Sequence, residues 1–394
     1  MNRLALAAAF LVAACGGGED GPPADAGNIG VPGTYTVQGV VRYEDKPPLD
    51  TGELGPITPK LSRGISVAVI AEDDGATLAM GITGDDGTYS LEFEGVGGEP
   101  IHILAVASST VPTRPINVRH TSAAGPGPIH GFGGPTIAAG IDTMHDVLVT
   151  VASDEAQAFN IFDTLVDVMD RIRMSLNTPT PIPLTAFWQV GNDDGTYYFQ
   201  TAMFLLGELS DDDGFDDTVI IHEAGHYVED VIGRSDSPGG GHDGSPTNPR
   251  LAWSEGFATY FAMAVRDLPI YMDSNAGGGW AYNADTSLTK AVATGPMTQP
   301  VSEDMISEIL WDMGDAPAAD DDAVAGSHEL VLALQNYVKT ATLRPAGGGG
   351  VDLVDALDGH FNTNGLTSCA AMRSVITTVH TFPYDFAATG GSCP

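Results

Sequence analysis

His222, Glu223 and His226 form the pattern H-E-x-x-H inside a segment with helical character. The run 218–232 contains no proline, and Asp216 or Asp217 before it can cap a helix start. Because residues four apart share one face of a helix, the two imidazoles project side by side and can bind one Zn²⁺. Glu223 lies one step around the helix, where it can act as general base on a water at the metal without being a ligand. The spacing therefore predicts a catalytic zinc site.

A third ligand is expected from the segment W-S-E-G-F-A-T-Y-F at 253–261. Asn248, followed by proline, supplies a helix start, and the mostly apolar run 251–265 predicts a buried helix. A carboxylate in such a helix is costly unless it is paired or bound to a cation, so Glu255 is the predicted ligand. Two histidines and one glutamate leave a coordination position open, as in catalytic zinc sites. His242, in the glycine-rich loop between the two helices, is the alternative ligand.

The segments H-E-A-G-H-Y-V-E-D and W-S-E-G-F-A-T-Y-F resemble the gluzincin metallopeptidases, and the second is very similar to the third-ligand helix of the gluzincin aminopeptidases. The resemblance covers roughly 216–265. It implies a zincin-like domain with zinc on His222, His226 and Glu255. It also implies an edge strand before the zinc helix that holds extended substrate, and 197–206 is the expected strand.

Two departures from the aminopeptidases bear on the reaction. The gap from His226 to Glu255 is longer, and the G-x-M-E-N motif that holds a substrate amino terminus is absent from the sequence. We therefore expect a zinc endopeptidase that acts on protein or peptide substrates. The alternatives are an exopeptidase and a cell-surface binding lipoprotein whose peptidase domain is inactive.

An oxyanion donor is expected near the C-terminal end of the peptidase region. Thermolysin-like enzymes have an aspartate-rich stretch before a histidine that stabilises the oxyanion, and 320–322 followed by His328 is similar in placement. His328 is therefore the predicted second catalytic residue, with Tyr260 and Tyr282 as alternatives.

An acidic turn with aspartates at 211–213 and 216–217 precedes the zinc helix. These carboxylates can together bind Ca²⁺, although their spacing is not that of an EF-hand loop. The other interpretation is a solvated turn whose charges favour the helix N-terminus.

The fold class predicted from the remaining pattern is α+β, with a β-sandwich over 34–152 and a zincin-like domain over 153–394. The piece G-D-D-G-T-Y-S-L at 84–91 resembles carboxypeptidase regulatory-like modules. We interpret the scattered histidines of this region as surface or core residues: His102, His120, His130 and His145. Short Val/Ile-rich runs predict the sandwich strands: Thr36–Val41, Ile65–Ala71, Thr77–Ile82, Tyr89–Phe93, Ile101–Ala107, Ile116–Arg119 and His145–Val151.

The zincin-like domain is expected to combine a mixed sheet with a mainly helical C-terminal part. It should open with a helix over Asp154–Ser175, followed by strands over Leu184–Val190 and Thr196–Leu206. A further helix is expected over Ser302–Met313.

The N-terminus has the features of a bacterial lipoprotein signal. A charged start is followed by an apolar run, and Leu11-Val12-Ala13-Ala14-Cys15 resembles a lipobox. The interpretation is a signal peptide at 1–14, a lipid anchor on Cys15 and a flexible tether over 15–33. Gly16 after the cysteine favours the outer membrane of the cell envelope, and an ordinary signal peptide with secretion is the alternative.

Composition excludes some partners and predicts one cross-link. A formal net charge of −36 argues against nucleic acid and anionic lipid as partners, and we expect a monomer. Once Cys15 is assigned to the anchor, Cys369 and Cys393 remain. In an oxidising exterior they should form a disulfide that adds about 3 kcal/mol of stability.

Overall fold

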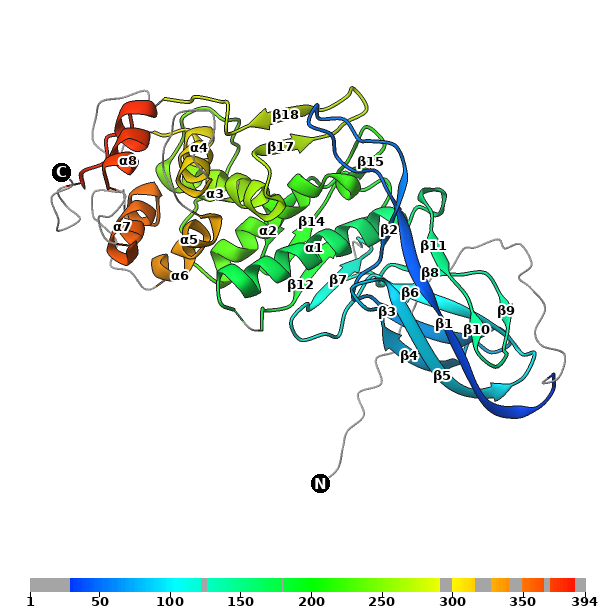
Figure 1. Cartoon of the computed structure of the whole chain (residues 1–394). Helices are drawn as coiled ribbons and strands as arrows, with labels where there is room; N and C mark the ends of the chain where they lie inside the picture. The colour runs from blue at the N-terminus through cyan, green and yellow to red at the C-terminus, as the bar shows by residue number, and fades with distance from the viewer. Residues whose placement is uncertain are drawn as a thin grey trace.

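The computed structural model describes residues 29–121, 126–178, 180–290, 300–315, 327–339, 349–364 and 369–386. It shows the expected mixture of helices and sheets (Figure 1). A β-rich N-terminal part lies beside a mainly helical part, and the long helix α1 (Ala156–Ser175) runs next to the strands that join them. Among the described residues, no helix is both long and apolar enough to span a bilayer. Cys15 and Cys393 lie outside these residues, so the lipid anchor and the disulfide stay predictions.

The N-terminal part contains two five-stranded sheets whose apolar side chains enter one continuous core. Buried residues alternate with partly exposed ones along β1 and β5, as expected for strands with one face in the core. One sheet consists of β1 (Pro32–Asp45), β2 (Thr58–Leu61), β5 (Thr88–Val96), β10 (Thr143–Met144) and β11 (Val147–Val149). The other consists of β3 (Ser66–Ala71), β4 (Thr77–Ile82), β6 (Pro100–Val106), β8 (Gly131–Gly133) and β9 (Ile137–Ala138).

One strand expected in the sandwich belongs to a different sheet. The strand β7 (Ile116–Arg119) pairs in parallel with β12 (Leu184–Phe187), and this sheet continues through β14 (Ala202–Phe204) to β13 (Tyr197–Phe199). Ile116 and Val118 are fully buried there. One sheet therefore contains strands from both sides of the boundary predicted near residue 152.

The long strand expected over Thr196–Leu206 is divided into two. Gln200 and Thr201 have φ of 49° and 65°, so the chain turns back between β13 and β14 and makes an antiparallel hairpin. This turn places β13 at the edge of the sheet, antiparallel to its neighbour. The edge strand is thus shorter than expected, but it has the expected position before α2 (Asp217–Val231).

Four long helices build the second part, and two of them start at side-chain caps. The Asn248 side chain accepts a hydrogen bond from Arg250 N at the start of α3, and Ser302 caps α4. These helices are α1, α2 (Asp217–Val231), α3 (Pro249–Arg266) and α4 (Glu303–Gly314). Shorter elements complete it: β15 (Gly207–Glu208), β16 (Asp211–Asp212), β17 (Ile270–Asp273), β18 (Trp280–Asn283), α5 (His328–Leu332), α6 (Leu334–Val338), α7 (Leu353–Asn364) and α8 (Cys369–Arg373).

Two glycines allow α2, α3 and α4 to pack at very short range. A Cβ atom on Gly225 of α2 would lie 2.8 Å from Ala258 Cα of α3. A Cβ atom on Gly256 of α3 would lie 2.6 Å from the Glu303 carbonyl oxygen at the start of α4. Any side chain at these positions would push the helices apart, so both glycines fix the distance between the elements that carry the site.

Ion pairs connect α1 to the N-terminal part. Asp163, whose side chain is 1% exposed, accepts a 2.7 Å hydrogen bond from Arg63 Nε and lies 3.5 Å from Lys60 Nζ. Arg63 also reaches Asp167, whose side chain is 48% exposed, at 2.8 Å. Arg114 makes two hydrogen bonds to Asp170 one turn further along.

Replacing the buried acid of this network should destabilise the protein much more than replacing the exposed one. Asp163→Ala leaves Arg63 and Lys60 without their buried partner, and we expect it to lower the free energy of unfolding by about 3 kcal/mol. The control Asp167→Ala removes a solvated pair and should cost less than about 1 kcal/mol. Urea denaturation measures both, and equal losses would contradict this account of the junction.

Candidate metal centre

Helices α2 and α3 bring His222, His226 and Glu255 together. The Glu255 Oε2 atom lies 3.2 Å from His222 Nε2 and 3.1 Å from His226 Nε2. Ligand atoms of all three residues lie within 4.8 Å of one another. The two imidazole rings are nearly perpendicular, at 85°, with centroids 4.9 Å apart. The two histidines of the motif and the predicted third ligand thus meet at one point.

Two hydroxyl groups of α3 contact the Nδ1 atoms of the imidazoles, on the side of each ring opposite Glu255. Ser254 Oγ lies 3.2 Å from His226 Nδ1 and donates its own hydrogen to Glu229, so it accepts from His226. Thr259 Oγ1 lies 3.2 Å from His222 Nδ1. With a hydrogen on Nδ1, a neutral ring has its lone pair on Nε2, directed at the carboxylate of Glu255.

This donor set fits a zinc ion. Two imidazole nitrogens and a carboxylate at these distances require either protons or a metal ion between them, and His₂Glu is a known catalytic zinc set. Burial alone would raise the pKa of Glu255, but the charges and hydrogen bonds of His226 and His222 lower that pKa well below its usual range. The carboxylate is therefore ionised and available as a ligand.

Glu223 presents an unused carboxylate oxygen beside the three residues. Its side chain is buried, and Oε2 has no hydrogen-bond partner. Burial raises the pKa of Glu223, against the opposing effect of His226 and His222. A buried acid with a raised pKa next to a metal centre is suited to accept and return a proton.

His242 approaches the same point from the loop between α2 and α3. Its Nδ1 lies 3.1 Å from Glu303 Oε2, at the start of α4, and its Nε2 lies 3.4 Å from Glu255 Oε2. The hydrogen bond to Glu303 raises the pKa of His242, against the effect of burial. His242 is not part of the three-residue group whose ligand atoms lie within 4.8 Å. The sequence indicated this histidine only as an alternative ligand, and its pairing with Glu303 was not apparent from the spacing.

The predicted oxyanion donor His328 is placed elsewhere. Its Nδ1 lies 3.0 Å from the Tyr260 hydroxyl, and its ring packs at 4.4 Å against Trp311, in the space left by the missing side chain of Gly314. Neither His328 nor Tyr260 lines the cleft beside Glu223. Tyr282 does line it, but its hydroxyl donates to Glu308. The aspartates at 320–322 lie outside the described residues.

Hollows lie on two sides of Glu223. One has a volume of about 450 Å³ and contains His222, His242 and Tyr271 in its lining. The other has a volume of about 660 Å³ and is bordered by the edge strand β13 together with His226 and Glu255. The edge strand β13 and Glu223 therefore line the same hollow.

Three aspartates in the lining of the first hollow form a cluster. Asp211, Asp213 and Asp273 have carboxylate oxygens within 4.8 Å of one another. Burial and neighbouring carboxylates raise the pKa of Asp213 to about 8 and that of Asp273 to about 6. Asp216 occupies the position before α2, but its carboxylate accepts hydrogen bonds from Ser274 rather than capping the helix. Calcium binding here stays a prediction.

Comparison with known families supports a peptidase. A family model described as Mycolysin C-terminal domain matches residues 175–349, which is less than half of the chain and includes α2, α3 and α4. The match indicates a zinc metallopeptidase. No curated protein matches the chain. Among solved structures, a 9R-lipoxygenase from Cyanothece PCC8801 aligns over 42% of this chain and 27% of its own, with 12% identity and a TM-score of 0.18, which is too low to support an argument.

The acidic cluster should make stability depend on pH. Because the raised pKa values make the folded state bind protons more tightly than the unfolded state, the free energy of unfolding should fall as pH rises from about 4 to about 8. Asp213→Asn removes one of these groups, so between pH 5 and 8 it should lose less stability than wild type, by on the order of 1 kcal/mol.

Urea denaturation without divalent cations measures this difference, with the exposed Asp193→Asn as control. If the free energy of unfolding changes with pH by the same amount in wild type and Asp213→Asn, the raised pKa of Asp213 is contradicted. If calcium binds the cluster, adding it should raise the stability of wild type at pH 8 and have less effect on Asp213→Asn.

Proposed function

We propose that the protein is a zinc-dependent endopeptidase that hydrolyses internal peptide bonds of protein or peptide substrates. The observation that supports it most is the meeting of His222, His226 and Glu255 at ligand distances, with the unpaired carboxylate oxygen of Glu223 beside them. We further propose that the enzyme acts at the bacterial cell envelope, anchored through Cys15 or secreted.

His222, His226 and Glu255 would hold the zinc ion, and zinc supplies a Lewis acid that activates water and polarises the peptide carbonyl. Ser254 and Thr259 orient the imidazoles so that both Nε2 atoms face the ligand position. Glu223 takes the proton of the attacking water and passes it to the leaving nitrogen.

His242 replaces His328 as the proposed oxyanion donor. Glu303 fixes the His242 ring through Nδ1 and thereby directs Nε2 toward the ligand group. A donor on a ring held by a carboxylate can stabilise charge that develops on the substrate oxygen. Strand β13 provides unpaired main-chain groups for an extended substrate, which favours cleavage within a chain over removal of a terminal residue.

The general base can be tested by a change that preserves shape. Glu223→Gln should retain one zinc per site, because the residue is not a ligand, and should lower kcat about 10²–10⁴-fold. Zinc content is measured by mass spectrometry, and activity with internally quenched peptides whose two ends are blocked. The exposed Glu92→Gln is the control. Full activity in Glu223→Gln, or wild type without zinc, would refute the mechanism.

The two roles open to His242 predict different results. As a donor, His242→Gln should retain zinc and lower kcat about 10²-fold with little change in KM. If His242 is instead a zinc ligand, His242→Gln should lose zinc. His328→Gln should lower thermal stability and leave kcat unchanged, because that ring packs in the core. If kcat falls with His328→Gln and not with His242→Gln, the assignment made from the sequence is right and ours is wrong.

A further inference from the structure

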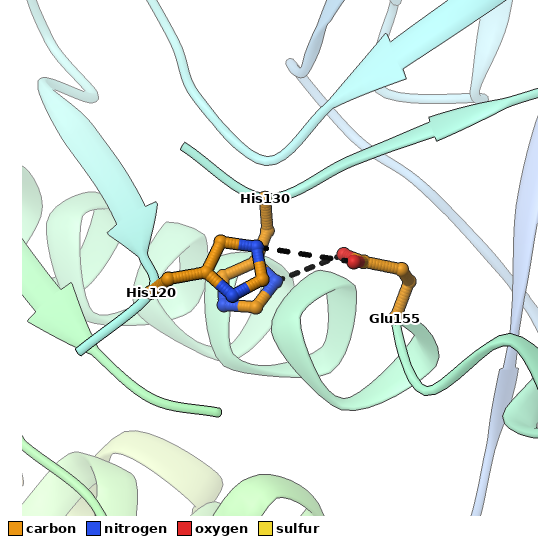
Figure 2. Close-up of side chains that lie close together, drawn as sticks. All are labelled: His120, His130 and Glu155. Atoms are coloured by element: carbon orange, nitrogen blue, oxygen red, sulfur yellow. Dashed lines mark hydrogen bonds and ion pairs between the residues drawn. The ribbon is translucent and has the colours of Figure 1, made fainter. Parts of the chain in front are cut away.

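His120, His130 and Glu155 form a second cluster of side chains of the kinds that bind metals. Their ligand atoms lie within 4.8 Å of one another, and none of the three lines the cleft beside Glu223. Figure 2 shows the two imidazoles one above the other, with the carboxylate facing the edges of both rings. In sequence these histidines are scattered, and only the fold brings them together.

Strand pairing places the two histidines on one face. Arg119 and Ile129 form an antiparallel bridge, so His120 and His130 are diagonal neighbours whose side chains project from the same side. Their rings stack with centroids 3.7 Å apart and an angle of 28°. The pairing thus sets two ring edges toward the same point.

Glu155 supplies the third ligand atom from the start of α1. It occupies the cap position of this helix, but its side chain makes no cap hydrogen bond. Instead Oε2 lies 2.9 Å from His130 Nδ1, and Oε1 lies 4.0 Å from His120 Nε2. The carboxylate is therefore directed at the imidazoles rather than at the helix backbone.

A backbone contact determines which nitrogen of His130 faces Glu155 with a lone pair. His130 Nε2 lies 2.8 Å from the carbonyl oxygen of Trp188, which can only accept, so Nε2 carries hydrogen. In the tautomer with a single hydrogen, on Nε2, the Nδ1 lone pair faces the Glu155 carboxylate at 2.9 Å. Two acceptors in this position require either a proton or a metal ion between them.

His120 can contribute a lone pair to the same point. Its Nε2 atom lies 4.0 Å from Glu155 Oε1, so this edge of the ring faces the carboxylate. A histidine whose other nitrogen is held by a backbone carbonyl, as in His130, is the usual arrangement of a metal-bound imidazole.

We propose that His120, His130 and Glu155 bind a divalent transition-metal ion, with Zn²⁺ as the matching species. Two imidazoles and one carboxylate suit zinc better than Ca²⁺ or Mg²⁺, which take oxygen ligands. The side chains of His120 and Glu155 are 30% and 16% exposed, which leaves one side open for entry and for a water ligand.

The site would connect segments from both parts of the protein. His120 follows β7, His130 precedes β8, and Glu155 precedes α1. The Trp188 carbonyl that contacts His130 follows β12. A metal here would therefore fix the junction between the N-terminal sheets and the helical part. This role does not depend on peptidase activity.

Zinc stoichiometry tests the proposal with the full-length protein. After removal of metal and dialysis against zinc, wild type should bind two equivalents per chain, and His120→Gln one. His226→Gln should also bind one, because it disrupts the centre on α2, and the double variant none. His102→Gln is the matched control: His102 lies 2.9 Å from Glu72, but it belongs to none of the three-residue ligand clusters among the described residues. It should bind two.

A second variant covers the case in which His120→Gln does not fold. Glu155→Gln keeps the shape of the side chain and should lose the same equivalent. A cobalt-loaded protein gives another readout, because Trp188 lies 5.6 Å from His130 and Co²⁺ at this site should quench its fluorescence in wild type and not in Glu155→Gln.

The results separate this site from the proposed catalytic centre. Suppose that wild type binds one equivalent of zinc, that His226→Gln binds none and that His120→Gln still binds one. This result would mean that His130 and Glu155 form only a protonated ion pair, and it would overturn the proposal. One equivalent that His120→Gln removes and His226→Gln retains would support it and contradict the catalytic centre instead.

Discussion

The close approach of α2 to α3 is the constraint on which the site depends. Gly225, inside the H-E-x-x-H segment, faces Ala258 with no room for a side chain between them. Only at this distance can Glu255 on α3 reach both imidazoles on α2. Gly256 repeats the arrangement toward α4, whose first residue, Glu303, holds His242. Small residues in the middle of helices thus set the geometry of the polar groups.

Sequence reasoning located the parts of the site that follow from local periodicity. The residues His222 and His226 share a face because they are one helical turn apart, and Glu255 is identifiable because a carboxylate in an apolar helix needs a cation. The helices α1, α3 and α4 begin and end within about two residues of the expected bounds, since their signals are local.

The features that sequence reasoning missed are contacts between distant segments. Neither the Glu303 that orients His242 nor the core position of His328 follows from spacing, because both depend on how α4 and α5 pack. The placement of β7 beside β12 is likewise a long-range pairing. The bridge between Arg119 and Ile129 is another long-range contact, and it places His120 beside His130, near Glu155. Sequence analysis had interpreted these two histidines as surface or core residues. The pairing of strands that are distant in sequence produces no local sequence pattern from which it could be predicted.

The zinc affinity of Gly225→Ala tests the central claim most directly. An added methyl group would force α2 and α3 apart, and we expect the dissociation constant of zinc at the α2–α3 centre to rise about 10-fold or more. Gly241→Ala is the matched control, because its Cβ would meet no atom within 4 Å. Both variants are measured in the His120→Gln background by competition with a zinc chelator. Equal affinity in the two variants would show that the helix spacing does not determine the metal site.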